Sequence, residues 1–143
     1  MRLTIACAVA SVVLSVSAPA FCRPASDFSG EWISYDYGCY DAWGNPTSGL
    51  QESIAISTSG SEMVATKITG DACVTAGAVT FIVKSGPDVD IGKSYPARIQ
   101  LGIPQNPNSS WGACTVRLDS LRKITVSGEG WSVTLFRKIA TMN

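Results

Sequence analysis

The chain contains no histidine. This absence excludes the serine and cysteine hydrolase arrangements that depend on an imidazole base, together with histidine-bearing metal sites. A carboxylate pair or a Ser-Lys dyad is all that remains for catalysis. The obvious carboxylates are Asp71, Asp88 and Asp90, but the last two lie in Ser-Gly-Pro-Asp-Val-Asp, a pattern typical of a solvated turn. We therefore expect no enzymatic activity, and no cofactor or metal site.

Charge is also scarce. Charged residues make up 15% of the chain, and 11 Lys and Arg residues balance 11 Asp and Glu residues, so the net charge is 0. Proteins that bind nucleic acid concentrate positive charge on one face. We therefore expect no nucleic-acid partner. A length of 143 residues suits one domain with one core.

Long apolar runs are few, and the clear case lies at the N-terminus. Arg2 precedes the apolar run 3–16, and small residues follow at Ala18 and Ala20. This is the layout of a signal peptide, and the run is short for a hydrocarbon core of roughly 30 Å. We predict a signal peptide over residues 1–20, a short N-terminal segment over 21–27 and one domain over 28–143. Retention as an anchor and a later cleavage site stay open. The mature protein would be secreted or periplasmic, without stable membrane insertion.

The domain shows strand patterns and almost no helix signals. One run alternates apolar with polar residues, and its apolar members are Tyr95, Ala97, Ile99 and Leu101. This pattern predicts a strand with one buried apolar face and one solvent-exposed polar face. Similar runs cover 31–37, 52–57, 62–68, 78–84, 114–118, 123–126 and 131–135. Closing such a sheet on itself removes both exposed edges. We predict an all-β fold, a small antiparallel up-and-down barrel of about eight strands, lipocalin-like and stapled by disulfides.

Three irregular segments, 38–50, 70–77 and 102–112, should emerge at one end of such a barrel, because its strands run alternately up and down. A short turn is expected at Asp119 and Ser120, and a longer one over 85–93. The three irregular segments combine aromatic rings with amide and carboxylate groups, which suits a ligand-binding mouth. The alternative is that these segments simply cap the barrel and that their tryptophans form its lid.

Five cysteines are present, and Cys7 would leave with the signal peptide. The four that remain suggest disulfides in an exported chain. Pairing of Cys39 with Cys73 is our first choice, and it would contribute about 3–4 kcal/mol on the chain-entropy estimate. Cys22 and Cys114 would form the other pair. Three connectivities stay open at this point.

The segment 64–81 is the most informative, since it predicts a strand, a loop between Gly70 and Gly77, and a second strand. Asp71 can accept hydrogen bonds from backbone N–H groups two residues on and so stiffen the loop. Alternation with Thr66 and Ile68 predicts that Lys67 lies on the outer face, beside Met63 and Ala65, unless a bulge near the strand end turns it inward.

This segment resembles the signature of the domain with which certain F-box proteins bind a D-type cyclin, a domain also present in plant chloroplast singlet-oxygen-signalling proteins. The family loop reads Lys-Ile-Thr-Gly-Asp-Pro-Asn-Val-Pro-Ala-Gly. The matching residues here are Lys67, Ile68, Thr69, Gly70, Asp71, Val74, Ala76 and Gly77. Looser matches at 43–52 and 103–112, the latter with Asn106, Pro107 and Trp111, extend the resemblance over about residues 30–137.

The departures from the family pattern bear on function. Ala72 and Thr75 replace the two prolines, Cys73 replaces the asparagine, and the later loop has Ser109 and Ser110 inserted and no arginine. The family role implies a barrel that receives the end of a client polypeptide in a cavity. This chain has no F-box segment, so a ubiquitin-ligase role does not follow.

We therefore expect an exported binding module that takes a peptide C-terminus or a small-molecule ligand in the barrel mouth. The alternative is a protein-protein interaction or inhibitor module, in which the same loops form a rigid surface for an exported protein partner. The first requires a concave pocket of a few hundred Å³, and the second a closed mouth. The candidate ligand-binding residues are Trp43, Asn45, Lys67, Asp71, Asn106 and Trp111.

Overall fold

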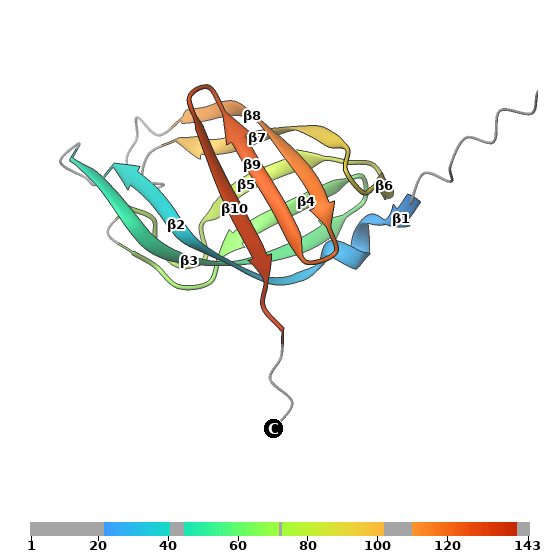
Figure 1. The fold of residues 1–143 in the computed structure, drawn as a ribbon, viewed down its shortest axis with the longest axis horizontal. Coiled ribbons are helices and arrows are strands. Elements are labelled where there is room, and N and C mark those ends of the chain that lie inside the picture. Colours follow the sequence, from blue (N-terminus) through green and yellow to red (C-terminus); the bar gives the residue numbers. More distant parts are fainter. Residues whose placement is uncertain (1–21, 41–44, 72, 102–109, 140–143) are drawn as a thin grey trace, which may run out of the picture.

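The computed structural model describes residues 22–40, 45–71, 73–101 and 110–139. Within them, eight antiparallel strands form a closed barrel in the order β10-β2-β3-β4-β5-β7-β8-β9 (Figure 1). The barrel strands are β2 (Gly30–Tyr40), β3 (Pro46–Ser59), β4 (Glu62–Lys67), β5 (Val79–Lys84), β7 (Ser94–Leu101), β8 (Ser110–Ser120), β9 (Lys123–Gly128) and β10 (Trp131–Arg137). The prediction of an all-β up-and-down barrel with about eight strands is confirmed.

Alternating apolar residues line the inside of the barrel, because successive side chains of a strand point to opposite faces. Ile54 and Ile56 of β3, Val116 and Leu118 of β8, and Leu135 of β10 are all buried in one core. The face predicted for β7 is confirmed as well, since Tyr95 is buried and Ala97 and Ile99 pack against the same core.

One end of the barrel is closed by the segment before the first barrel strand. β1 (Cys22–Pro24) pairs with β6 (Asp88–Asp90), and the 3₁₀ helix η1 (Ala25–Phe28) follows directly. Phe28 is fully buried, and its carbonyl accepts a hydrogen bond from Trp32 Nε1 at 3.0 Å. The segment 85–93 was predicted as a turn, but it contains the strand β6. This strand forms because β1 pairs with it, and the sequence around residues 85–93 does not indicate that partner. Figure 1 shows β1 and β6 together at this end.

The opposite end, which we call the open end, carries the β2–β3, β4–β5, β7–β8 and β9–β10 connections, because consecutive barrel strands run in opposite directions. Figure 1 shows the β2–β3 hairpin flaring away from β10 there. The prediction of an irregular segment over 38–50 is wrong for most of its length, because β2 and β3 stay paired as far as Tyr40 and Pro46. The short turn predicted at Asp119 and Ser120 lies slightly later, since Ser120 still pairs with Lys123.

The barrel closes through a short contact between β10 and β2. Their ladder contains two residue pairs, Phe136 with Ile33 and Arg137 with Trp32. The Arg137 guanidinium donates hydrogen bonds to the carbonyls of Asp27, Ser29 and Leu121, and it lies 5.3 Å from the centre of the Trp32 ring. This side chain therefore ties the last strand to the first at the closed end.

No helix among the described residues is long and apolar enough to cross a membrane.

Replacement of Arg137 by Met should lower the free energy of unfolding by about 2–3 kcal/mol, because the apolar chain still covers Trp32 but three carbonyls lose a charged donor. Urea denaturation followed by circular dichroism measures this change. Arg122→Met, at an exposed arginine of the β8–β9 turn, is the matched control and should change stability by less than about 0.5 kcal/mol. Equal effects of the two substitutions would contradict the role assigned to Arg137.

Candidate functional site

A β-bulge in β2 turns two side chains toward the barrel interior at the open end. The register with β3 shifts between Ser34 and Tyr37 and again between Tyr37 and Cys39. Tyr35 and Asp36 are both exposed, whereas Ser34 is buried and Tyr37 is partly buried. Because a bulge adds one residue to one strand, the inward face changes parity after it. Tyr37 and Cys39 therefore belong to the open end of the interior.

A disulfide joins Cys39 of β2 to Cys73 in the β4–β5 loop, with a Cα–Cα distance of 6.2 Å. The predicted Cys39–Cys73 pairing is confirmed. The second predicted pairing is wrong, because Cys22 and Cys114 are both free. Cys114 faces the barrel core, whereas Cys22 is exposed on β1 outside the barrel. The Asp71 carboxylate lies within 4.8 Å of the sulfurs of Cys39 and Cys73, but sulfurs bonded to each other are not thiolate ligands.

The β4–β5 loop is held by Asp71. Its Oδ1 accepts hydrogen bonds from the backbone N–H groups of Cys73 at 2.8 Å and Val74 at 2.9 Å. The predicted stiffening role of Asp71 is thereby confirmed. Gly70 allows the chain to return closely, since a Cβ there would lie 2.9 Å from the backbone nitrogen of Ala76. The loop thus presents Asp71 to the end of β4 in a defined orientation.

Lys67 lies inside the barrel and is surrounded by polar groups. Its Nζ is 3.2 Å from Glu52 Oε1, 2.7 Å from Asp71 Oδ2 and 4.4 Å from the centre of the Tyr37 ring. Its side chain is 0% exposed. Asp71 Oδ2 thus forms an ion pair with the Lys67 ammonium group.

The prediction that Lys67 lies on the outer face is wrong. The inner face of β4 carries Met63, Ala65 and Lys67, and the outer face carries Val64 and Thr66. Both faces of this strand are nearly equally apolar, so the period of two did not reveal which one is buried. The neighbouring strand decides it, because Glu52 of β3 and Asp71 of the loop compensate an inward charge.

The acidic groups around Lys67 have pKa values that are shifted in different directions. Burial raises the pKa of Glu52 above its usual value, and the charge of Lys67 offsets this only in part. Burial also raises the pKa of Asp71, but the Lys67 ammonium and the two backbone donors together outweigh it, so the net shift is downward. Burial, with the nearby charges of Glu52 and Asp71, raises the pKa of Tyr37 far above its usual range. Asp71 is therefore the more readily ionised of the two carboxyl groups.

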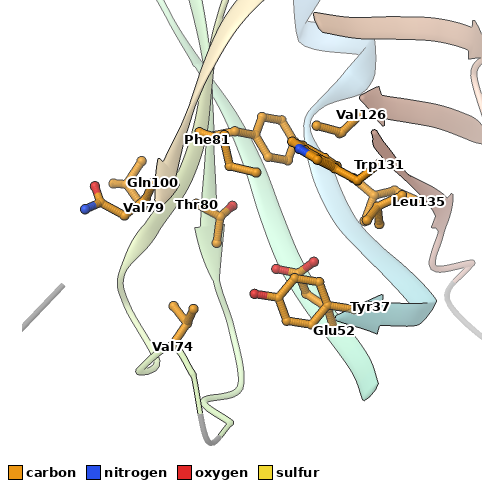
Figure 2. A pocket seen from close by; sticks show the side chains of 12 residues that line it. Tyr37, Glu52, Val74, Val79, Thr80, Phe81, Gln100, Val126, Trp131 and Leu135 are labelled. Carbon is orange, nitrogen blue, oxygen red and sulfur yellow. The ribbon is translucent and has the colours of Figure 1, made fainter. Parts of the chain in front are cut away.

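A two-part cavity occupies the open end. The outer chamber has a volume of about 550 Å³ and lies among β2, the start of β3, the β4–β5 loop, β7 and β10. A smaller inner chamber of about 40 Å³ continues toward the core. Tyr37, Val74, Ile99, Gln100, Trp131 and Val133 line both. Figure 2 shows Tyr37 and Glu52 close together in one part of the pocket, Phe81, Trp131 and Leu135 in a second part, and Val79 and Gln100 in a third.

The wall near Trp131 depends on a glycine. Trp131 pairs with Gly128 across the β9–β10 hairpin, and a Cβ at Gly128 would come within 2.6 Å of the indole ring. The ring therefore rests against the backbone of Gly128. Any side chain at that position would displace the indole from the cavity wall.

The residues predicted to bind ligand do not all meet at this cavity. Lys67 and Asp71 lie behind its wall in the buried cluster. Asn45 is exposed next to β3. Trp111 belongs to β8 and stacks at 5.0 Å on Arg98 outside the barrel, away from the cavity. Its placement in a mouth loop is therefore wrong, because β8 begins before it. Trp43 and Asn106 fall outside the described residues.

Sequence reasoning missed Tyr37, Glu52 and Trp131. Glu52 carries a usable signal, because it shares its strand face with Ile54 and Ile56 and is a lone charge in an apolar row. Trp131 lies on the same strand face as Val133 and Leu135, so its inward orientation followed from the alternation, but nothing in the sequence connected it with the cavity. Tyr37 carries no such signal, because the alternation of apolar and polar residues along β2 does not reveal the bulge that turns this side chain inward.

Comparison with known proteins adds no relative. No protein-family model, curated protein or solved structure matches the chain.

Replacement of Lys67 by Met should lower the free energy of unfolding by about 3–5 kcal/mol, because it leaves Glu52 and Asp71 without a buried counter-charge. Thermal and urea denaturation measure the loss. Lys84→Met at an exposed lysine is the control, and its effect should stay within about 0.5 kcal/mol. A Lys67 variant as stable as the control would show that the cluster contributes nothing to the fold.

The stabilising effect of Asp71 should depend on pH. Asn at this position keeps an oxygen for Cys73 and Val74 but loses the charge opposite Lys67, which should cost about 1–3 kcal/mol at pH 7. Because folding lowers the pKa of Asp71, its contribution is present above the usual aspartate pKa and is lost as pH falls through the lowered value. Urea denaturation of Asp71→Asn and of the parent should therefore converge on acidification. Asp88→Asn, at an exposed site, should show no such convergence, and a pH-independent Asp71 effect would contradict this assignment.

Proposed function

We propose that this chain is an exported, non-enzymatic binding module that takes a small ligand or the end of a peptide into the open end of its barrel. The outer chamber is the observation that supports this proposal. Its volume of about 550 Å³ falls within the range of roughly 300–1,000 Å³ that is usual for ligand pockets. The alternative, a protein-protein interaction module, requires a closed barrel mouth, and a chamber of this volume at the open end argues against it.

The chemistry of the walls supports a ligand with a mainly apolar body. Apolar side chains from five parts of the barrel surround the inner chamber, and they are Val74, Val79, Phe81, Ile99, Val126, Val133 and Leu135, of which Val74, Ile99 and Val133 also line the outer chamber. Tyr37, Glu52, Thr80 and Gln100 supply the polar groups. A large apolar surface with a few fixed polar groups is the usual composition of a binding pocket, since apolar burial provides affinity and polar groups set orientation.

Access is supported by the incomplete contact between β2 and β10. Their two residue pairs lie near the closed end, so Tyr37 and Trp131 approach the cavity from strands that are not hydrogen bonded to each other there. The Cys39–Cys73 disulfide holds β2 to the β4–β5 loop on the other side. The cavity thus combines a stiff wall with an open one, which suits entry of a ligand without unfolding of the barrel.

Binding should be tested with a panel of small apolar compounds and short peptides, using NMR spectra of the oxidised protein. The indole signal of Trp131, identified by its loss in Trp131→Ala, should shift on binding. Trp131→Ala and Gly128→Ala should each weaken binding about tenfold, because both remove the indole from the wall.

Trp111→Ala is the matched control. Trp111 is 41% exposed and Trp131 is 37% exposed, so the two substitutions remove similar surface, but only Trp131 lines the cavity. Binding that survives loss of Trp131 and is weakened by loss of Trp111 would move the site to the outside of the barrel. Absence of binding by every compound and peptide would overturn the proposal in favour of an interaction surface.

A further inference from the structure

The groups along and behind the inner wall carry more negative than positive charge. The cluster contains one ammonium group, that of Lys67, and two carboxyl groups, those of Glu52 and Asp71. With both carboxyl groups ionised, its net charge is negative by one unit. Glu52 is also the one charged residue among the described residues that line the two chambers. The cavity therefore offers a carboxylate to its occupant.

Lys67 is not available to an occupant. Its side chain is 0% exposed, and its ammonium group already contacts Glu52, Asp71 and the face of Tyr37. A ligand carboxylate in the inner chamber would meet the Glu52 carboxylate, and no other cation is among the described residues that line either chamber. Like charges at close range in a water-poor site are unfavourable. The geometry thus disfavours an anionic group at this depth.

A cationic group meets the opposite situation. It would neutralise the cluster, and the rings of Tyr37 and Trp131 line both chambers. Aromatic faces attract cations, most strongly where water is excluded. The inner chamber, at about 40 Å³, has room for a group the size of an ammonium ion, and the larger outer chamber has room for an apolar body.

We propose, building on the binding function above, that the ligand carries an ammonium group on an apolar body and that Glu52 binds this group in the inner chamber. The ammonium group belongs either to a small amine or to the free N-terminus of a peptide that begins with an apolar residue. Glu52 contacts Lys67 of β4 directly, and it interacts electrostatically with Tyr37 of β2 and with Asp71 of the loop after β4. The charge of Glu52 therefore sets the selectivity of the site.

Three probes that share one apolar body test the proposal: 3-phenylpropylamine, 3-phenylpropan-1-ol and 3-phenylpropanoate. Calorimetry with the oxidised protein should show the ammonium form binding at least about tenfold more tightly than the alcohol, and the carboxylate most weakly. Two peptides distinguish the sources of the amine, namely Phe-Gly-Gly-amide with a free N-terminus and N-acetyl-Gly-Gly-Phe with a free carboxylate. Tighter binding of the first peptide than of the small amine would assign the site to peptide N-termini.

Two further measurements connect the preference to Glu52. Glu52→Gln should reduce the preference for the amine over the alcohol to about threefold or less, whereas Glu62→Gln, on the outer face of β4, should leave it unchanged. In the parent protein, amine affinity should rise with pH as Glu52 ionises, and alcohol affinity should not. Asp71, with a lowered pKa, and Tyr37, with a raised one, do not change charge in the weakly acidic range. This pH test does not depend on how well the Gln variant folds.

The outcomes separate the two proposals. Equal binding of amine and alcohol, or tighter binding of the carboxylate, would overturn the ammonium assignment and leave the binding function standing. Binding of none of the three probes and neither peptide would overturn both. An amine preference that Glu52→Gln leaves intact, with no pH dependence, would place the ammonium group elsewhere and also overturn the role of Glu52.

Discussion

The barrel is closed by two residue pairs between its last and first strands, and the rest of the architecture depends on how this contact is confined to one end. Arg137 holds the closed end by hydrogen bonds to three backbone carbonyls around Trp32. Beyond Ile33, β2 no longer pairs with β10, and the register between β2 and β3 shifts. The cavity lies where β2 and β10 are unpaired, so the short closing contact and the open end belong to one arrangement of the strands.

The buried charges of Lys67, Glu52 and Asp71 have a different role from the apolar core. Taking charges out of water costs free energy that their mutual attraction only partly returns, so such a cluster is weak evidence for added stability. It does specify position, because each partner restricts the other two. The disulfide and the Asp71 turn place the loop opposite β4. The second carboxylate of the cluster makes this part of the cavity wall negatively charged. This polarity distinguishes the open end from an ordinary apolar pocket.

Much of the fold was predictable because it rests on local patterns. The strands follow from the period of two, and the Asp71 turn follows from an aspartate placed two residues before the N–H that it binds. The Cys39–Cys73 pair followed from placing both residues at one end of the barrel. The predictions that failed involve long-range partners. Lys67 was placed outside because Glu52, fifteen positions earlier, is its neighbour only through the β3–β4 ladder.

The sequence by itself determined the strand pattern and the barrel, because alternation and chain direction constrain both locally, and it favoured the Cys39–Cys73 pair among three possible connectivities. Only the tertiary structure decided which face of β4 is buried, where Tyr37 points and which tryptophan lines the cavity. These depend on a bulge in β2 and on pairing between strands distant in the chain. A shift of one residue exchanges the two faces of a strand, and the composition of β4 is nearly the same on both. The functional site was therefore determined by register, a property that no single strand carries.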